Sequence, residues 1–485
     1  MRSPVIRSWR TSALCGSALT ALQIAGCAVG PDFAPPAPPS VERYTPQKTA
    51  SPGEGQRFRE GAEVPARWWT VFASPRLDEL IDEAIAASPT LEAAEAAIHA
   101  ADFNASAAAG AWFPQLALTS GSTYNLSSGD ATNSTVLQTP FSYFTKQVQV
   151  SYTLDVWGAT QRQVESLEAQ RESLTYLKQA AQMMLAADIA HAAIEEAMLR
   201  DQIAATRRIV ALEEERLRLL ERQFAYGAIA SPEVLSQRTA LTQVLETLPG
   251  LESRLAQQRN RLTALAGRYP SREIEATFEL SQLALPRDLP VSLPSQLVKQ
   301  RPDIRTAEAN IHAASALVGV AVAARLPNVT LTAVGGTSAF QLAQLFAPGT
   351  GFYTLAGAVA QPAFDGFALL DRQRAAEALL QQAEAQYRDV ALKAFENVAD
   401  SLRALQSDAR AVASARAAEA TSKLYLDKVR WRLKQGDVSQ LVVVDAQRAV
   451  LNATKTRIEA EAQRLADSVA LFVALGGGWG KKEDR

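Results

Sequence analysis

Few residues of this chain have the types and spacing that chemistry requires. The histidines and cysteines are isolated in the sequence: His99, His191, His312, Cys15 and Cys27. Both cysteines lie within the first 27 residues, so neither a disulfide framework nor a metal-binding cysteine pair is indicated. The sequence contains no Ser/His/Asp constellation, no distinctive acid pair and no glycine-rich phosphate loop. It therefore predicts no catalytic residue, no metal site and a protein that is not an enzyme.

Cys27 is the one position where a covalent modification is predicted. A start with three arginines precedes an apolar segment, Ala13–Leu22, that is too short to span a membrane, which is typical of a secretory signal. The segment ends in Ile24-Ala25-Gly26-Cys27, which resembles the bacterial lipobox. The resemblance implies an N-acyl diglyceride lipid on Cys27 as the first mature residue, and no other cofactor. Ala28 favours sorting to the outer membrane, while an ordinary signal with a chance cysteine is the alternative.

The chain is dominated by two stretches without glycine or proline, Ala159–Tyr226 and Phe367–Gln435. Both are rich in Ala, Leu, Glu, Gln and Arg, the residues that lose least on entering a helix. At about 1.5 Å per residue, each helix would be roughly 100 Å long. Each follows an aspartate in a turn and stops at a glycine, Gly227 or Gly436, after which a second helix is expected to return.

Three local predictions concern the first long hairpin. Ser231, followed by Pro232, is expected to cap the returning helix. Pro249-Gly250 is expected to interrupt that helix. The mixed charges of Glu213–Arg222 are typical of a solvated helix face.

Strand candidates form two hairpins, one before each long helix: about Gln115–Leu126 with Phe141–Trp157, and about Asn328–Phe340 with Gly351–Phe364. In the second strand of the first hairpin, Phe141–Trp157, apolar and polar side chains alternate, which predicts one apolar and one polar face. The segments exceed the ~9–11 residues of a tilted membrane strand. A transmembrane hairpin is therefore at least as plausible as a hairpin of a soluble sandwich.

The two halves of the chain are related. Ser88–Leu116 matches Arg301–Val329 at a constant offset of 213 residues, from Pro89 to Pro302 and from Pro114 to Pro327, without a gap. His99 and His312 occupy the same position in the repeat, which favours packing over catalysis. The duplication makes two related halves of one body more plausible than three separate domains.

These patterns indicate a conduit. No run of about 18 apolar residues follows the signal, so an outer-membrane protein with this sequence would span as a closed β-barrel. Four strands cannot close, because known barrels start at about eight. Several copies must therefore pool their strands, and their long helices, side by side, would form a tube whose far mouth is the pair of turns at Gly227 and Gly436.

The chain resembles the outer membrane factors, the TolC family, in their lipidated OprM/NodT-type branch. Matching motifs occur in order along the chain: Gly30-Pro31-Asp32 after the lipobox, Trp68-Trp69, Leu154–Gly158, Leu293–Ser295, Arg301–Ile304, Phe364–Gly366, Val444–Arg448 and Ala474–Trp479. The resemblance implies an α+β fold, mainly α-helical. Long antiparallel helices would form a periplasmic α-barrel, and four transmembrane strands per chain would build a trimeric twelve-stranded β-barrel. A mixed belt would include Phe58–Ser74, Tyr269–Pro294 and the C-terminal end.

The resemblance also implies a function and partners. Members are passive outer-membrane exit channels for drugs and toxic compounds, lipid-anchored and extending into the periplasm. They are homotrimers that bind a periplasmic adaptor (membrane fusion) protein, which links them to an inner-membrane transporter of the RND type. Neither nucleotide nor nucleic acid is involved, in agreement with the balance of 49 basic and 51 acidic residues.

Two groups of site residues follow from the resemblance. Family tips carry a glycine-centred turn that meets the adaptor, here Tyr226-Gly227-Ala228 and Gln435-Gly436-Asp437, although glycine is also expected simply as a helix C-cap. Family channels often narrow near the tips at acidic residues. Here the segment before the second tip is largely basic, so Asp427 and Arg430 mark a possible gate region whose ion preference stays open.

Alternatives belong to other classes. A type I-like secretion channel fits the pattern, but such members usually lack the lipobox. A structural coiled-coil envelope lipoprotein would explain the long helices and leave the hairpins unexplained, and a cell-wall enzyme would need a catalytic constellation. The predicted organisation is a signal peptide (1–26), a lipid anchor and linker (27–75), a first repeat (76–270), an equatorial connection (271–300), a second repeat (301–476) and a tail (477–485).

Overall fold

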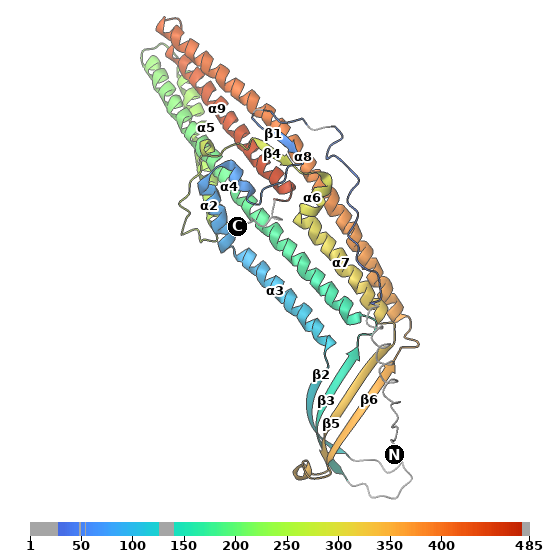
Figure 1. Ribbon diagram of the computed structural model, residues 1–485. Helices are drawn as coiled ribbons and strands as arrows, with labels where there is room; N and C mark the ends of the chain where they lie inside the picture. The colour runs from blue at the N-terminus through green and yellow to red at the C-terminus, as the bar shows by residue number, and fades with distance from the viewer. Residues whose placement is uncertain (1–27, 48–49, 54, 126–139, 478–485) are drawn as a thin grey trace, which may run out of the picture. The chain divides into compact units, whose positions relative to one another are not determined.

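The computed structural model describes residues 28–47, 50–53, 55–125 and 140–477 (Figure 1). Cys27 and the predicted signal lie outside these residues, as does the loop of the first hairpin. The chain packs as two compact units, and each unit draws on both halves of the sequence. Unit 1 comprises Met1–Pro36, Ala97–Ser173 and Ala307–Tyr387, and unit 2 comprises Ala37–Ala96, Leu174–Thr306 and Arg388–Arg485.

Unit 1 contains one four-stranded antiparallel sheet. Its strands are β2 (Gln115–Asn125), β3 (Phe141–Leu154), β5 (Asn328–Ala339) and β6 (Gly351–Ala360), in the order β2-β3-β5-β6 (Figure 1). Both predicted hairpins are confirmed, and they pair with each other through β3 and β5. The duplication therefore produces one continuous sheet.

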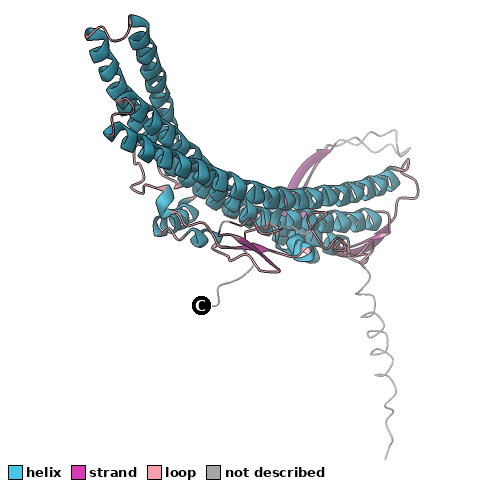
Figure 2. Cartoon of the chain, turned by 90° about the horizontal axis from the view of Figure 1, so that it is seen from above, coloured by secondary structure: helices cyan, strands magenta, loops and turns pink. Residues whose placement is uncertain are grey.

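Two α-helices of 67 residues each run out of this sheet, α4 (Ala159–Ala225) and α8 (Ala368–Lys434), and helices make up most of the chain (Figure 2). Both long helices were predicted to within one residue. The Asp155 carboxylate accepts bonds from the N–H groups of Thr160 and Gln161, at 3.1 and 3.0 Å, and Asp365 accepts one from Leu369 at 2.8 Å. These aspartates satisfy N–H groups that would otherwise lack a partner at the start of each helix.

Two helices of 35 residues return along the long ones, α5 (Ser231–Leu265) and α9 (Gln440–Ala474). Two predictions about α5 are wrong. The N-cap is Ala230, not Ser231, and the helix continues through Pro249-Gly250. A proline in a helix costs about 3 kcal/mol, and buried polar contacts join α5 to α4 on both sides of it, from Gln237 to Glu213 and from Arg259 to Glu196.

The repeated segments fold alike, as α3 (Pro89–Ala109) and α7 (Pro302–Ala323). None of the helices within the ranges that the structure describes has the length and hydropathy of a membrane-spanning helix. Short elements complete the chain: β1 (Arg57–Glu60), η1 (Trp68–Phe72), α2 (Pro75–Ala87), η2 (Gly110–Trp112), η4 (Leu280–Gln282), β4 (Asp288–Val291), α6 (Pro294–Gln300) and η5 (Leu342–Gln344).

The expected belt segments come together in unit 2. Strands β1 and β4 pair in parallel, Phe58 opposite Leu289, which joins the two sequence regions predicted for the belt. Trp68 is fully buried and stacks on Phe472 of α9 at 5.7 Å between ring centroids. These aromatic contacts connect the start of the packed chain to its end.

Candidate functional site

The first helix tip is a glycine-capped turn between α4 and α5. Gly227 has φ +70°, its N–H donates to the Phe224 carbonyl, and the Ala228 N–H donates to the Gln223 carbonyl, both at 2.9 Å. These two bonds are the Schellman arrangement, which satisfies the last carbonyls of the helix. The ring of Tyr226 is 88% exposed beside the turn.

The second tip, between α8 and α9, repeats this geometry. Gly436 has φ +74°, its N–H donates to the Leu433 carbonyl, and the Asp437 N–H donates to the Arg432 carbonyl, both at 3.0 Å. The Arg432 guanidinium also pairs with the Asp437 carboxylate at 2.6 Å. Both tips lie at the same end of the helices of unit 2 (Figures 1 and 2).

The tip glycines differ from the other glycine caps in what surrounds them. Gly267 and Gly476 end α5 and α9 with the same bonds and positive φ, but an added Cβ would meet Ala87 at 2.8 Å and the Gln300 carbonyl at 3.1 Å, respectively. An added Cβ at Gly227 or Gly436 would meet nothing within 4 Å. Capping alone requires the left-handed conformation, but it does not require an open surface. The backbone of both tips is therefore open at the glycine.

A small core of their own supports the ends of α8 and α9. Buried Leu426 and Val429 on α8 pack with Val443 and Ala446 on α9. This core fixes the ends of α8 and α9 relative to each other and so supports the second turn. Trp431 lies on α8 between this core and the tip and is 63% exposed, so an aromatic side chain is available next to the turn.

The two residues of the possible gate region lie on α8 before the second tip. The Arg430 guanidinium is 3.8 Å from the Asp427 carboxylate, one helical turn away, and both side chains are mostly exposed. An exposed pair at this distance contributes little to stability. Both groups are therefore accessible from solvent on the last turns of α8.

A buried carboxylate that the sequence did not single out ties α4 to α5 and α9. Glu213 is 1% exposed; its carboxylate accepts bonds from Gln237 of α5 at 2.6 Å and from Arg448 of α9 at 3.2 Å. The prediction of a solvated face for Glu213–Arg222 is wrong here, because at 3.6 residues per turn part of any charged run faces the neighbouring helices.

A signal for this connection was present in the sequence. Arg216 of α4 pairs with Asp445 of α9, so Glu213 and Arg216 meet Arg448 and Asp445 across two antiparallel helices. Each helix carries an acidic and a basic residue three positions apart in the same order. When the two helices run in opposite directions, the acid of each helix lies opposite the base of the other. The spacing can be seen in the sequence, but only the structure shows which helices face each other.

The sheet of unit 1 has two different faces. In the register of the four strands one face carries large apolar side chains, several of them exposed: Leu116, Leu118, Val148, Val150, Leu331, Tyr353, Leu355 and Val359. The centre of the other face carries polar, uncharged side chains, Gln147, Gln149, Ser151, Thr153, Thr330 and Thr332, with Val334 beside Gln149. Toward the loop ends of the hairpins this face also carries Phe141, Tyr143 and Phe352, and the apolar face carries Lys146. One face therefore suits hydrocarbon and the other suits water.

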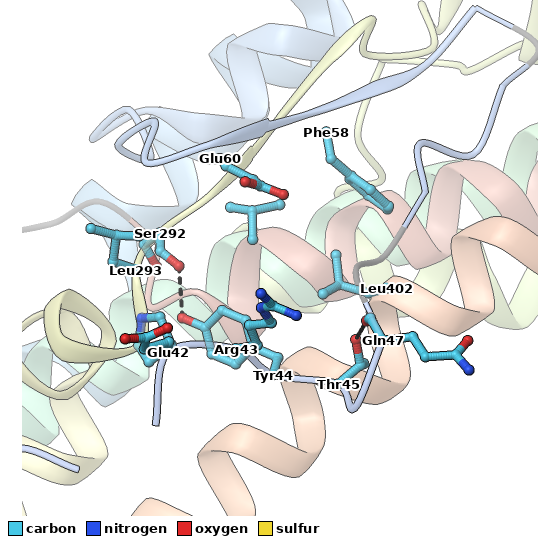
Figure 3. A pocket seen from close by; sticks show the side chains of 12 residues that line it. Glu42, Arg43, Tyr44, Thr45, Gln47, Phe58, Glu60, Ser292, Leu293 and Leu402 are labelled. Atoms are coloured by element: carbon cyan, nitrogen blue, oxygen red, sulfur yellow. Dashed lines mark hydrogen bonds between the residues drawn. The ribbon is translucent and has the colours of Figure 1, made fainter. Parts of the chain in front are cut away.

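A cavity of about 220 Å³ lies in unit 2, where residues 42–47 pass β1, β4 and α8 (Figure 3). The Tyr44 hydroxyl donates to the Ser292 carbonyl at 2.8 Å, and burial raises the pKa of Tyr44 to about 12, against the lowering effects of this bond and of Arg301. Tyr44 is therefore a neutral donor that fastens the N-terminal segment. The cavity wall also carries Glu42, Arg43 and Glu60, a mixture of charges that selects no ligand class.

No cluster of metal-binding side chains occurs in the part of the chain that the structure describes. His312 accordingly packs: its Nε2 lies 3.0 Å from Glu165, and its ring stacks on Phe33. A sheet with one apolar and one polar face, followed along the chain by long helices that end in open turns, defines a channel-forming membrane protein.

Comparisons with known proteins agree. The family of outer membrane efflux proteins matches residues 80–268 and 293–477, and this chain belongs to that family. It is 30% identical over 451 residues to the pyoverdine export outer membrane protein OpmQ of Pseudomonas putida, covering 92% of this chain and 94% of that protein. It is 26% identical over 461 residues to the probable outer membrane lipoprotein SilC of Salmonella typhimurium, covering 94% and 96%.

The fold is that of solved channels. The outer-membrane channel OprN superimposes with a TM-score of 0.83 at 24% identity, covering 93% of this chain and all of that one. The chain is therefore an outer membrane efflux protein with the fold of a channel, and it is not an enzyme. The predicted family, the mainly helical fold with strands, and the assignment to outer membrane efflux are confirmed.

Proposed function

We propose that three copies of this chain form one exit duct, that the two tips bind a periplasmic adaptor, and that an RND-type inner-membrane transporter drives export through it. The observation that carries this proposal is the four-stranded sheet with one apolar and one polar face. Among the described residues its edge strands, β2 and β6, each pair on one side only. Open strand edges are not stable in hydrocarbon, so each edge needs a strand from a neighbouring copy.

Three copies give a twelve-stranded barrel, within the range of outer-membrane barrels. Its outer surface would be the face of Leu118 and Leu355, and its lumen would be lined by uncharged groups such as Gln149 and Thr332. The mass of the native particle in mild detergent, corrected for bound detergent, tests this. Three chains per particle are expected, and a single chain per particle would overturn the proposal.

The adaptor contact is assigned to Tyr226-Gly227-Ala228 and Gln435-Gly436-Asp437. Asn tolerates the left-handed conformation better than other residues with a side chain, so Gly436→Asn keeps the turn and fills the open space above it. Gly366 is a matched control, because it has φ +68° and nothing within 4 Å of an added Cβ, but it lies at the other end of α8. We expect Gly436→Asn to weaken adaptor binding and drug export, and Gly366→Asn to leave both unchanged.

Equal adaptor affinity in Gly436→Asn and wild type would refute the tip assignment without affecting the duct. The lipid on Cys27 is a separate proposal, supported by the lipobox and by a relative that is named a lipoprotein. The mass of the N-terminal peptide of the mature protein tests this proposal. We expect the peptide to begin with an acylated Cys27. A mature N-terminus at any other residue, or an unmodified Cys27, would refute the lipid assignment.

Asp427 and Arg430 are proposed to line the duct near its periplasmic mouth. Support comes from their exposed side chains on α8, within two to three turns of Gly436. Replacing Arg430 by Gln should change the cation-to-anion preference of single channels in planar bilayers, because a fixed charge in a narrow aqueous pore acts on every passing ion. The same change at Arg374, exposed near the start of α8, is the control. An unchanged preference in Arg430→Gln would place the narrowest part of the duct elsewhere.

A further inference from the structure

The sheet of unit 1 carries one charge, and it lies on the apolar face. Lys146 of β3 is the single charged residue in the described strands β2, β3, β5 and β6. It pairs with Ser120 of β2 and Thr337 of β5, on the same face as Leu118 and Val148. A cation on a lipid-facing strand destabilises a membrane barrel, most at the bilayer midplane and least at the interfaces. Lys146 therefore requires an interface position and an anion.

The register gives Lys146 the depth of an interface. Lys146 is nearer the loop end of β3 than the end that leads into α4. It lies between two exposed aromatic residues of the same face: Tyr353 is level with the next pair toward α4, and Tyr124 is level with a pair nearer the loops. Aromatic girdles mark the interfaces of membrane barrels, and a long lysine side chain extends its charge toward the head groups. The ammonium of Lys146 is therefore placed at head-group depth.

A hollow of about 360 Å³ opens on the apolar face beside Lys146. Leu118, Val148 and Gly335 line the part toward the middle of the sheet, where they lie level with one another. Phe346, from the connection between β5 and β6, lines it too and is 73% exposed. The Lys146 ammonium is 5.5 Å from the centroid of the Phe346 ring, within the range of a cation–π contact. The hollow is thus apolar, with a positioned cation in its wall.

Two adjacent glycines of β5 show that the hollow is not a by-product of strand packing. Gly336 has a structural reason, because an added Cβ there would collide with the Lys146 carbonyl of the neighbouring strand. An added Cβ on Gly335 would meet only the Phe352 carbonyl, at an ordinary 3.9 Å. A glycine inside a strand weakens it and often marks the close approach of a ligand or another backbone. Since no backbone approaches Gly335 among the described residues, its missing side chain serves to keep the hollow open.

We propose that this hollow binds one phosphorylated glycolipid of the outer leaflet, with a lipid phosphate on Lys146 and an acyl chain along Leu118 and Val148. None of the described residues that line the hollow is acidic, so a lipid phosphate is the anion that complements Lys146 at head-group depth. The loop end of the sheet is opposite the periplasmic helices and therefore lies in the outer leaflet. The proposal rests on the trimeric barrel proposed above, which turns this face toward lipid, and it gives one site per chain.

Native mass spectrometry of the full-length protein in detergent tests the site, because one spectrum counts both chains and bound lipids. The probe is bisphosphorylated lipid A, and dephosphorylated lipid A is the control ligand. We expect up to three molecules of lipid A on each trimer. Lys146→Met keeps an apolar side chain of similar length and removes the charge. It should weaken binding of the bisphosphorylated form by about tenfold, because a hydrogen bond to a charged group is lost, and leave binding of the dephosphorylated form unchanged.

A second variant tests the shape of the hollow. Gly335→Val fills it with a residue that favours strands, and it should weaken binding of both forms of lipid A. Gly357→Val is the matched control: Gly357 lies on the same face of β6, outside the hollow, and an added Cβ there would meet Leu331 at an ordinary 3.4 Å. It should leave binding unchanged.

The outcomes separate the site from the barrel. Wild-type affinity for bisphosphorylated lipid A in Lys146→Met, or for either form in Gly335→Val, would overturn the site while the trimer stands. Phosphatidylglycerol that binds as tightly as lipid A would overturn the assignment to a glycolipid. Wild-type protein that shows only single chains would instead refute the barrel on which the proposal rests.

Discussion

Two neighbouring ion pairs between α4 and α5 should differ sharply in what they contribute to stability. Glu196 is fully buried, and its Oε1 accepts bonds from Arg259 of α5 at 2.8 Å and from Arg200 at 2.8 Å. Glu195, the preceding residue, pairs with Arg254 at 3.0 Å, and both of these side chains are substantially exposed. The chemistry and the pair of helices are the same, and burial differs.

Replacing Arg259 by Met keeps most of its apolar contacts and removes its charge. Glu196 is then left buried with one partner, and the Ile274 carbonyl loses a bond of 2.8 Å. Removing one partner of a buried pair costs about 3–5 kcal/mol. Replacing Arg254 by Met breaks an exposed pair, which contributes about 0.2–1 kcal/mol. We therefore expect the first variant to lose several times more stability than the second.

Unfolding in denaturant, followed by far-ultraviolet circular dichroism on the purified protein in detergent, measures this difference; where unfolding is irreversible, its rate replaces the free energy. Adding Glu196→Gln to Arg259→Met should recover part of the loss, because the stranded charge is removed. Equal losses in Arg259→Met and Arg254→Met, or no recovery in the double variant, would refute the argument from burial.

Two further predictions concern pH and glycine. Burial, together with the neighbouring Asp467 carboxyl, raises the pKa of Asp408 to about 7. The folded protein therefore holds a proton on Asp408 that the unfolded chain releases above about pH 4, so this group favours folding at low pH and its contribution is lost as the pH rises to 7. We expect Asp408→Asn to unfold at a higher temperature than wild type at pH 8. If the difference in Tm between Asp408→Asn and wild type is the same at pH 5 and at pH 8, this prediction is refuted. Gly267→Ala should destabilise more than Gly227→Ala: both incur left-handed strain of about 1–2 kcal/mol, but only the former meets Ala87, so equal unfolding midpoints would contradict the packing argument.

The sequence by itself determined the elements and their order. The long helices could be predicted because 67 residues of good helix formers lie between an aspartate and a glycine, all of them local signals. The strands of unit 1 could be predicted from alternation, and their four-strand total gave the argument for an oligomer. The tips were located because a turn glycine at the end of a long helix is also a local feature.

Tertiary structure decided which polar groups are buried and which glycines are crowded. Glu213 and Glu196 have the same surroundings in sequence as exposed charges, and their burial depends on which helix lies opposite. Pro249 lies within α5 despite its local preference, and α5 is joined to α4 by buried contacts on both sides of it. Gly30, Gly158 and Gly319 lie far apart in the chain, and in the fold an added Cβ at each would come within 3 Å of the backbone of another segment. Propensity acts over a few residues, whereas burial and close approach are set by residues hundreds of positions away, so only the folded chain can show them.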